Sequence, residues 1–230
     1  MAHARKVFLL GIVLLIAPTV SSAAFIPTTD LVPLDTLGGE PLAVDGREFS
    51  NFAMDAMSSG GAPLPLPGDV YLQGGTDGDG CSTVLRFLTC GWVVGPGQAV
   101  QVNVSFDVSV VAGEGCLIDA VALDLTGFAT PGSSMISAGE FVAGSPGGGA
   151  LASLSASKSY GDADAYLSDS VSFAETNVIH VTKSFALVGD SRGGGIAHLG
   201  EFYQFYRNMP EPSVLVLSGL GAMLVCRRRR

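Results

Sequence analysis

The strongest constraint on the fold is the alternation of apolar and polar residues between Val100 and Val110. The apolar positions are Val100, Val102, Val104, Phe106, Val108 and Val110, and the polar positions are Gln101, Asn103, Ser105, Asp107 and Ser109. A strand with this period of two turns one face to a core and the other to water, as in antiparallel sheets. The segment therefore predicts a long strand with one buried face.

Other strand-like segments alternate with turns rich in glycine and proline. The expected strands are 44–52, with a hairpin turn at Asp45-Gly46, and then 69–73, 82–88, 91–94, 117–125, 151–159, 165–173, 177–188 and 196–206. The expected loops and turns are 59–68, 95–97, 113–115, 130–134, 145–149 and 189–195. These segments predict an all-β domain: an antiparallel β-sandwich of about eight to ten strands, jelly-roll-like or immunoglobulin-like.

Several residues can be assigned to a side of this sandwich. We expect Phe49 and Phe52 to anchor the first hairpin in the core. In the segment 177–188 one face carries Ile179, Val181, Lys183, Phe185 and Leu187. Because His180 lies between Ile179 and Val181, the same period places it on the opposite face, which meets solvent.

Charge limits the partners of the domain between residues 25 and 207. The chain has 21 acidic and 12 basic residues; one acidic and six basic residues lie outside this range, which leaves 20 against 6, or −14. Such a domain is unsuited to nucleic acid and to anionic membrane surfaces. A domain of this negative charge attracts divalent cations and cationic surfaces instead.

Two acidic residues suggest a cation site, although the pattern is incomplete. Asp77 and Asp79 alternate with glycine in the segment 74–80, as at the start of a calcium loop. No glutamate follows at the spacing of an EF-hand, and no helix pattern flanks the segment. The alternative is a turn of acidic residues and glycine that binds no metal. We therefore expect no resident cofactor and retain calcium binding at these two residues as an alternative.

The cysteines allow one disulfide bond in an oxidising compartment. Cys81, Cys90 and Cys116 fall within the domain, and Cys226 lies near the end of the chain. On one straight strand Cys81 and Cys90 would be roughly 30 Å apart, too far to pair. Either of them can reach Cys116 across a turn, and the sequence does not choose between the two.

No residue is assigned a catalytic role. The domain has two histidines, His180 and His198, and no serine in a nucleophile-elbow sequence. Asp162 and Asp164 fit a solvated turn. Paired carboxylates could serve a glycosidase, but aromatic platforms for sugars are few, with Trp92 the single tryptophan. We therefore expect a protein that is not an enzyme.

The amino-terminal segment has the three parts of a secretory signal peptide. Arg5 and Lys6 precede an apolar stretch, 7–20, and a cluster of small residues that ends at Ala24. We expect cleavage between Ala24 and Phe25, or one residue earlier, which makes 1–24 a signal peptide read by the general secretion machinery and signal peptidase. The alternative is a signal anchor that is not cleaved.

The carboxy-terminal segment also has three parts. Pro210, Glu211 and Pro212 form an extended break, because each proline disfavours helix at the residue before it. The run 213–226 is apolar and uncharged, and Arg227, Arg228, Arg229 and Arg230 follow it. An apolar helix ended by arginines fits a membrane segment whose basic end stays in the cytoplasm.

This order of features resembles the PEP-CTERM sorting signal of bacterial envelope proteins. The resemblance implies that exosortase recognises the motif 210–212, that 213–226 is a transmembrane helix, and that 227–230 is a stop. The segment Phe49-Ser50-Asn51-Phe52 resembles an early strand of the same proteins. One departure is length, since 14 residues span roughly 21 Å of helix against a hydrocarbon core of ~30 Å.

The sequence therefore predicts a non-catalytic exported protein of the cell surface or extracellular matrix. The resemblance implies a transient stay in the inner membrane, processing by exosortase and association with exopolysaccharide. Two alternatives stay open: a surface module that binds carbohydrate or calcium, and a secreted hydrolase.

Overall fold

The computed structural model describes residues 25–37, 39–77, 82–113, 116–130, 134–159, 166–192 and 194–207. The predicted signal peptide, sorting motif, membrane helix and basic tail lie outside these ranges, as do Asp79, Cys81, Asp162 and Asp164. Among the described residues, no helix combines the length and the apolar character needed to cross a membrane.

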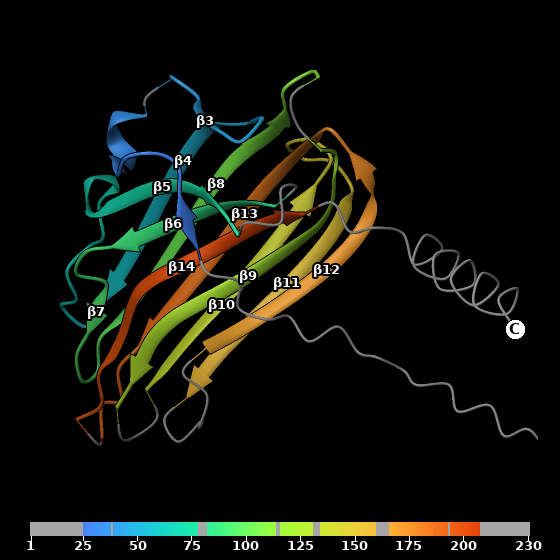
Figure 1. Cartoon of the computed structure of the whole chain (residues 1–230). Coiled ribbons are helices and arrows are strands. Elements are labelled where there is room, and N and C mark those ends of the chain that lie inside the picture. Colours follow the sequence, from blue (N-terminus) through green and yellow to red (C-terminus); the bar gives the residue numbers. More distant parts are fainter. Residues whose placement is uncertain are drawn as a thin grey trace, which may run out of the picture.

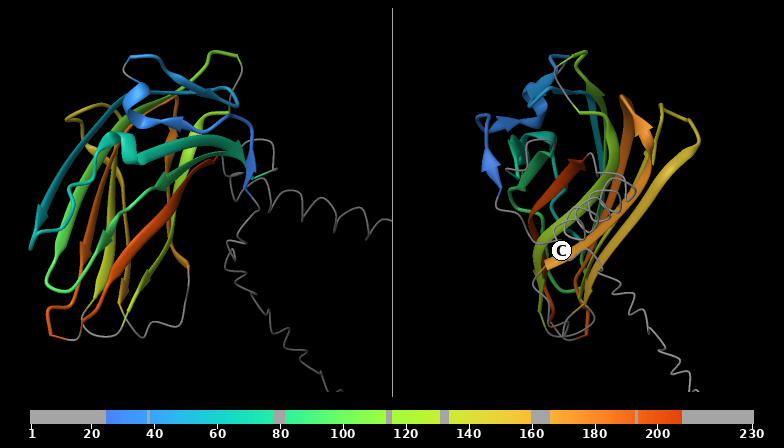
Figure 2. Two further views of the ribbon diagram at one scale, coloured as in Figure 1. Left: turned by 90° about the vertical axis from the view of Figure 1, so that its left-hand side faces the viewer. Right: turned by 45° about the vertical axis from the view of Figure 1, so that its right-hand side comes forward.

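Two antiparallel sheets pack face to face (Figures 1 and 2). The β14 sheet has the order β1-β5-β6-β14-β9-β12, with β2 on β5 and β7 on β14; the β8 sheet has the order β11-β10-β13-β8-β4-β3. This arrangement confirms an all-β antiparallel sandwich.

Ten of the described strands have seven or more residues. The strands of the β14 sheet are β1 (Ile26–Pro27), β2 (Val32–Pro33), β5 (Val70–Thr76), β6 (Thr83–Thr89), β7 (Val93–Val94), β9 (Ile118–Ala129), β12 (Tyr166–Thr176) and β14 (Ala197–Arg207). The strands of the β8 sheet are β3 (Leu42–Val44), β4 (Arg47–Ser59), β8 (Ala99–Val110), β10 (Met135–Ala143), β11 (Ala150–Ser159) and β13 (Val178–Val188). Two short 3-10 helices, η1 (Leu34–Thr36) and η2 (Pro67–Asp69), complete the described elements.

Strand β8 confirms the period-two prediction. Its apolar positions from Val100 to Val108 are buried, and Val110 at the strand end is half-buried. The strand pairs with β4 on one side and β13 on the other, which makes it a central strand of its sheet.

The predicted hairpin at Asp45-Gly46 is also confirmed. It joins β3 to β4, and the φ angles of the two turn residues are 47° and 72°. A two-residue turn with positive φ at both positions matches the twist of antiparallel strands, and Asp-Gly is among the pairs that tolerate it. Further along β4 the register shifts between Ser50 and Ala53, where Asn51 has a φ of 55°.

Aromatic rings fill the space between the sheets. Phe106 lies 5.3 Å from Phe52, 5.8 Å from Phe87 and 6.4 Å from Phe49, measured between ring centroids. Phe202 stacks on Phe87 at 4.3 Å. The expected anchor Phe49 is fully buried, and Phe52 packs against the core from a half-buried position.

One strand of the β8 sheet was not predicted. Strand β10 lies between β11 and β13, in a stretch that the sequence left unassigned between two turns. Its inward face includes Glu140, and its outward face includes Gly139 and Phe141. An acidic residue on the core side and an aromatic one outside reverse the usual pattern, which hid the strand. The expected strand at 117–125 starts instead at Ile118, and Leu117 is exposed.

The aromatic core gives a stability prediction. Phe106→Ala should lower the free energy of unfolding by about 3–5 kcal/mol, because it empties a fully buried site in contact with three other rings. Phe141→Ala is the matched control, since Phe141 is 41% exposed on the outer face of the same sheet. Urea denaturation of both variants measures the difference, and similar losses would contradict this description of the core.

Candidate functional site

A row of polar and aromatic side chains crosses the outer face of the β14 sheet. It consists of Gln73, Arg86, Tyr203, Asp124 and Ser168, which lie opposite one another on β5, β6, β14, β9 and β12. These strands follow one another across one layer in Figure 1. Neighbouring strands lie about 4.8 Å apart, so this transverse row spans roughly 19 Å.

Arg86 is held rigidly within the transverse row. Its Nε and Nη2 atoms donate to Oε2 of Glu201 at 2.9 and 2.6 Å, and its Nη1 donates to Oε1 of Gln73 at 3.3 Å. The guanidinium carbon lies 5.9 Å from the ring of Phe25 and 5.8 Å from the ring of Tyr203. A cation fixed by a carboxylate and two rings loses little side-chain freedom when a ligand binds.

Phe25 reaches the transverse row because β5 has a glycine beneath it. A Cβ atom at Gly75 would come within 2.4 Å of the Phe25 ring and of the Ile26 carbonyl oxygen. The ring meets Tyr203 edge-on, with 5.6 Å between centroids. The absence of a side chain at Gly75 therefore permits the aromatic pair beside Arg86.

Asp124 lies on the other side of Tyr203. Burial raises its pKa above the ordinary value, and the nearby Arg207 guanidinium opposes the rise. Its Oδ1 atom is buried and finds no hydrogen-bond partner in the part of the chain that the structure describes. A hollow of about 140 Å³ lies here, lined by Ala122, Asp124, Ser168, Asp169 and Ser170. The hollow offers carboxylate and hydroxyl oxygens to a ligand that brings hydrogen-bond donors.

Asp77, the described member of the expected calcium pair, has a different partner. Its Oδ2 atom lies 3.2 Å from Nη2 of Arg207, and its side chain is buried. The Arg207 guanidinium also lies 5.0 Å from the centre of the Phe205 ring. Within the described ranges, no group of three or more His, Cys, Asp and Glu residues is placed to hold a metal ion.

The outer face of the β8 sheet is polar, but its groups bond to one another. Asp107 accepts from Nδ2 of Asn51 at 2.7 Å and contacts Nδ1 of His180 at 2.6 Å. Asn103 donates to Asp55 at 2.8 Å and accepts from Ser184 at 2.7 Å. His180 therefore lies on the outward face, as predicted, and forms part of a network whose members already have partners.

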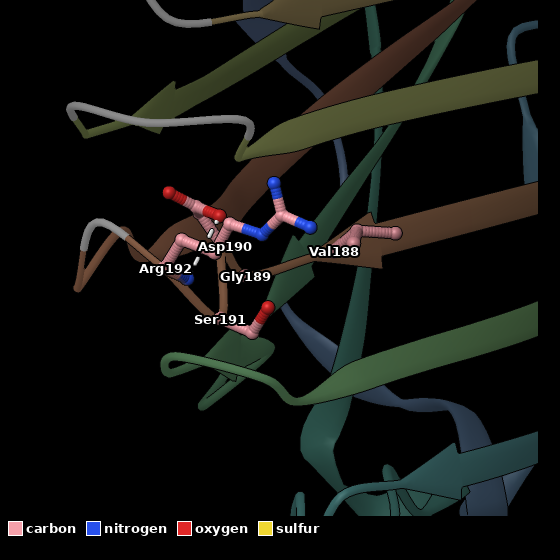
Figure 3. Close-up of a pocket in the computed structure, with 5 residues that line it drawn as sticks. All are labelled: Val188, Gly189, Asp190, Ser191 and Arg192. Atoms are coloured by element: carbon pink, nitrogen blue, oxygen red, sulfur yellow. Dashed lines mark hydrogen bonds between the residues drawn. The ribbon is translucent and has the colours of Figure 1, made fainter.

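A second hollow, of about 290 Å³, lies at the turn that follows β13 (Figure 3). It is lined by five consecutive residues, Val188 to Arg192, and the backbone N–H of Arg192 donates to Oδ1 of Asp190 at 3.1 Å. Figure 3 shows the side chains of Asp190, Ser191 and Arg192 pointing in different directions. A hollow made by one turn brings no groups together from separate strands, so we do not treat it as the site.

The remaining predicted residues are dispersed. Cys116 forms a disulfide bond, whereas Cys90 is a free, exposed thiol, which removes Cys90 as a partner of Cys116. His198 lies on the outer face of the β14 sheet, away from His180, and burial lowers its pKa. Trp92 is buried against Phe185 and offers no surface platform.

Sequence reasoning did not find the transverse row. Each member occupies a position that a period-two pattern assigns to the outer face, so the sequence indicates which residues point outward. It does not indicate that Arg86, Tyr203 and Asp124 are opposite one another, because Tyr203 lies 117 positions after Arg86 in the chain.

No protein-family model matches the chain, and no curated protein matches it. Several solved structures are similar in part. The carbohydrate-binding module TmCBM61, in complex with β-1,4-galactotriose, is 14% identical over 60% of this chain and 88% of its own length, with a TM-score of 0.31. A carbohydrate-binding module of the β-sandwich superfamily is 10% identical over 72% of this chain and 56% of its own, with a TM-score of 0.26.

A third similar structure is endoglucanase 3 of Trichoderma harzianum, from family GH12. It is 9% identical over 68% of this chain and 98% of its own, with a TM-score of 0.25. At these TM-scores the similarities carry no argument about function, which must rest on the geometry of the described residues.

Asp124 gives a prediction about stability and pH. Because burial raises its pKa, the folded protein holds this proton more tightly than the unfolded chain, and ionisation costs stability above the folded pKa. Asp124→Asn should therefore raise the melting temperature by a few degrees at about pH 7, and the gain should disappear below 3.8, the ordinary value.

The matched control is Asp55→Asn, at an exposed carboxylate that accepts a hydrogen bond from Asn103. This change should bring no gain at about pH 7. Thermal unfolding across the pH range measures both variants, and a destabilised Asp124→Asn at about pH 7 would contradict the account.

Proposed function

We propose that this chain is a non-catalytic module that binds carbohydrate on the outer face of its β14 sheet. The observation that carries the proposal is the transverse row, in which the Tyr203 ring lies between a fixed cation, Arg86, and the carboxylate of Asp124. One oxygen of this carboxylate has no partner among the residues that the structure describes. These three groups belong to neighbouring strands, so the sheet itself sets their spacing.

The chemistry of sugars matches this set of side chains. A pyranose ring has apolar C–H faces, which pack on aromatic rings, and a rim of hydroxyl groups, which both donate and accept hydrogen bonds. Tyr203 supplies the ring, and Asp124 and Ser168 supply acceptors. Arg86 supplies the N–H groups that remain beyond the three that bond to Glu201 and Gln73.

Binding suits this face better than hydrolysis. A glycosidase needs one carboxyl group that gives up a proton and another that acts as base or nucleophile. Glu201 accepts two hydrogen bonds from Arg86 through its Oε2 atom, so this carboxylate is already held by a partner within the sheet. We therefore assign Glu201 the task of positioning Arg86.

The second part of the proposal concerns location. The carboxy-terminal motif Pro210-Glu211-Pro212, the apolar run after it and the four arginines favour export and processing by exosortase. An exopolysaccharide at the cell surface is then the natural ligand of the sandwich. The negative charge of the domain favours a neutral or cationic polysaccharide over an acidic one.

Substitution at Tyr203 tests the binding site. Tyr203→Ala should weaken binding to soluble polysaccharides by roughly tenfold, because stacking on one aromatic ring contributes about 1 kcal/mol or more. Phe141→Ala, on the outer face of the other sheet, should leave binding unchanged. Affinity electrophoresis and calorimetry against neutral and cationic polysaccharides measure the effect. Unchanged binding in Tyr203→Ala would refute the assignment of this face.

Substitution at Glu211 tests the sorting signal separately. Glu211→Ala should leave export intact and block release from the inner membrane, because the resemblance makes Glu211 the central residue of the recognised motif. Cell fractionation measures the distribution. Unchanged release would refute the role of the motif without bearing on carbohydrate binding.

A further inference from the structure

Three polar side chains meet in the core between the two sheets, away from the transverse row. Lys183 comes from β13, Glu140 from β10 and Gln204 from β14. Lys183 and Gln204 are 0% exposed and Glu140 is 3% exposed. An amine, a carboxylate and a carboxamide are thus enclosed together without access to bulk water.

Each of these three groups contacts the other two. Nζ of Lys183 contacts Oε2 of Glu140 and Oε1 of Gln204. Nε2 of Gln204 donates to Oε1 of Glu140 at 2.9 Å. One carboxylate therefore lies against both the lysine nitrogen and the amide nitrogen of Gln204, while the lysine nitrogen also contacts the carboxamide that it could attack.

We propose that Lys183 and Gln204 form an intramolecular isopeptide bond, with Glu140 as the catalytic acid and base. A lysine amine can displace ammonia from a carboxamide when a neighbouring group moves the protons. This reaction needs the three groups that are present, and it needs Nζ to move from its contact with Oε1 of Gln204 onto the adjacent Cδ atom. It needs no cofactor, oxidant or reductant.

Glu140 carries two protons in turn from Lys183 to the leaving nitrogen. It takes the first proton from the Lys183 ammonium, and the neutral Nζ attacks Cδ of Gln204. In the tetrahedral intermediate Glu140 gives this proton to Nε2 and is again a carboxylate. It then takes the second proton from Nζ as the Cδ–Nε2 bond breaks, and it passes this proton to the departing ammonia. The sum is one ammonium and one carboxamide converted to one secondary amide and one ammonium ion, with Glu140 again a carboxylate.

The surroundings favour the reaction over its alternatives. Burial lowers the pKa of Lys183, and the adjacent Glu140 carboxylate opposes this, so deprotonation of the amine costs less than it would in water. Nζ lies 5.7 Å from the centre of the Phe202 ring, on the apolar side of the cluster. Water cannot compete for the intermediate, and the three strands hold the reacting atoms together without loss of translational freedom.

The product would join β13 to β14. These strands belong to different sheets, so the bond would be a covalent tie across the core. Lys183 and Gln204 lie on either side of a segment of 20 residues, 184–203. The bond between them would therefore keep this segment as a closed loop when the protein unfolds. A loop closed in the unfolded state lowers its conformational entropy and stabilises the folded protein.

Trypsin digestion of the denatured full-length protein tests the proposal. Trypsin does not cut after an acylated lysine, so Lys183 should resist cleavage. The expected product is one branched peptide in which 159–192 is joined to 193–207, lighter than the sum of the two peptides by the mass of one ammonia. Complete cleavage after Lys183, with 159–183, 184–192 and 193–207 recovered separately, would overturn the proposal.

Three variants test the assigned roles. Glu140→Gln should leave Lys183 open to cleavage, whereas Glu48→Gln, at an exposed glutamate of β4, should still give the branched peptide. Lys183→Arg keeps a cation in the core but cannot form the amide, so it should give no branched peptide. This variant tests the bond whether or not Glu140→Gln folds. A branched peptide in folded Glu140→Gln would overturn the role of Glu140. A link from Lys183 to the peptide 87–158, with loss of water, would show that Glu140 itself is the acceptor and would overturn the assignment of Gln204.

Discussion

The polar cluster of Lys183, Glu140 and Gln204 constrains how the two sheets can pack. A lysine between two apolar layers is costly unless its charge is paired and its donors are satisfied. Here the partners come from both sheets, so a shift of one sheet over the other would separate Lys183 from Gln204. Arg47 makes a similar link, since it donates to the hydroxyl of Thr83 in the other sheet and to the carbonyl oxygen of Cys116. The aliphatic and aromatic core residues supply the apolar burial, whereas these polar contacts select one alignment.

The sequence predicted much of the fold and little of the site. The pattern of β8 and the Asp45-Gly46 turn are local features, and both are confirmed. The inward position of Lys183 also followed from period two. Strand β10 was missed because its core-facing Glu140 is intelligible only with Lys183 opposite it. The transverse row could not be predicted, because its register joins strands that are distant in the sequence.

The two outer faces of the sandwich differ in how fully their polar groups are paired. On the β8 sheet, Asp107 and Asn103 each form hydrogen bonds with side chains on the neighbouring strands. These groups are therefore already engaged within the sheet. On the β14 sheet a rigid cation, Arg86, and an acceptor that has no donor among the described residues, Oδ1 of Asp124, lie on either side of Tyr203. A surface that keeps an unmet acceptor loses some stability, and such costs are common where proteins bind ligands.

The position of β14 has a consequence for how the chain reaches its final form. This strand is the last described segment in sequence, yet it lies between β6 and β9 near the middle of its sheet, and it carries Phe202 and Gln204 into the core. A nascent polypeptide that has emerged only as far as β13 would have two unsatisfied sheet edges and a buried amine without its amide neighbour. Cooperative folding of the sandwich must therefore wait until the chain has emerged as far as residue 207. Because β14 pairs with strands that are distant in the sequence, this last step is slow and all-or-none.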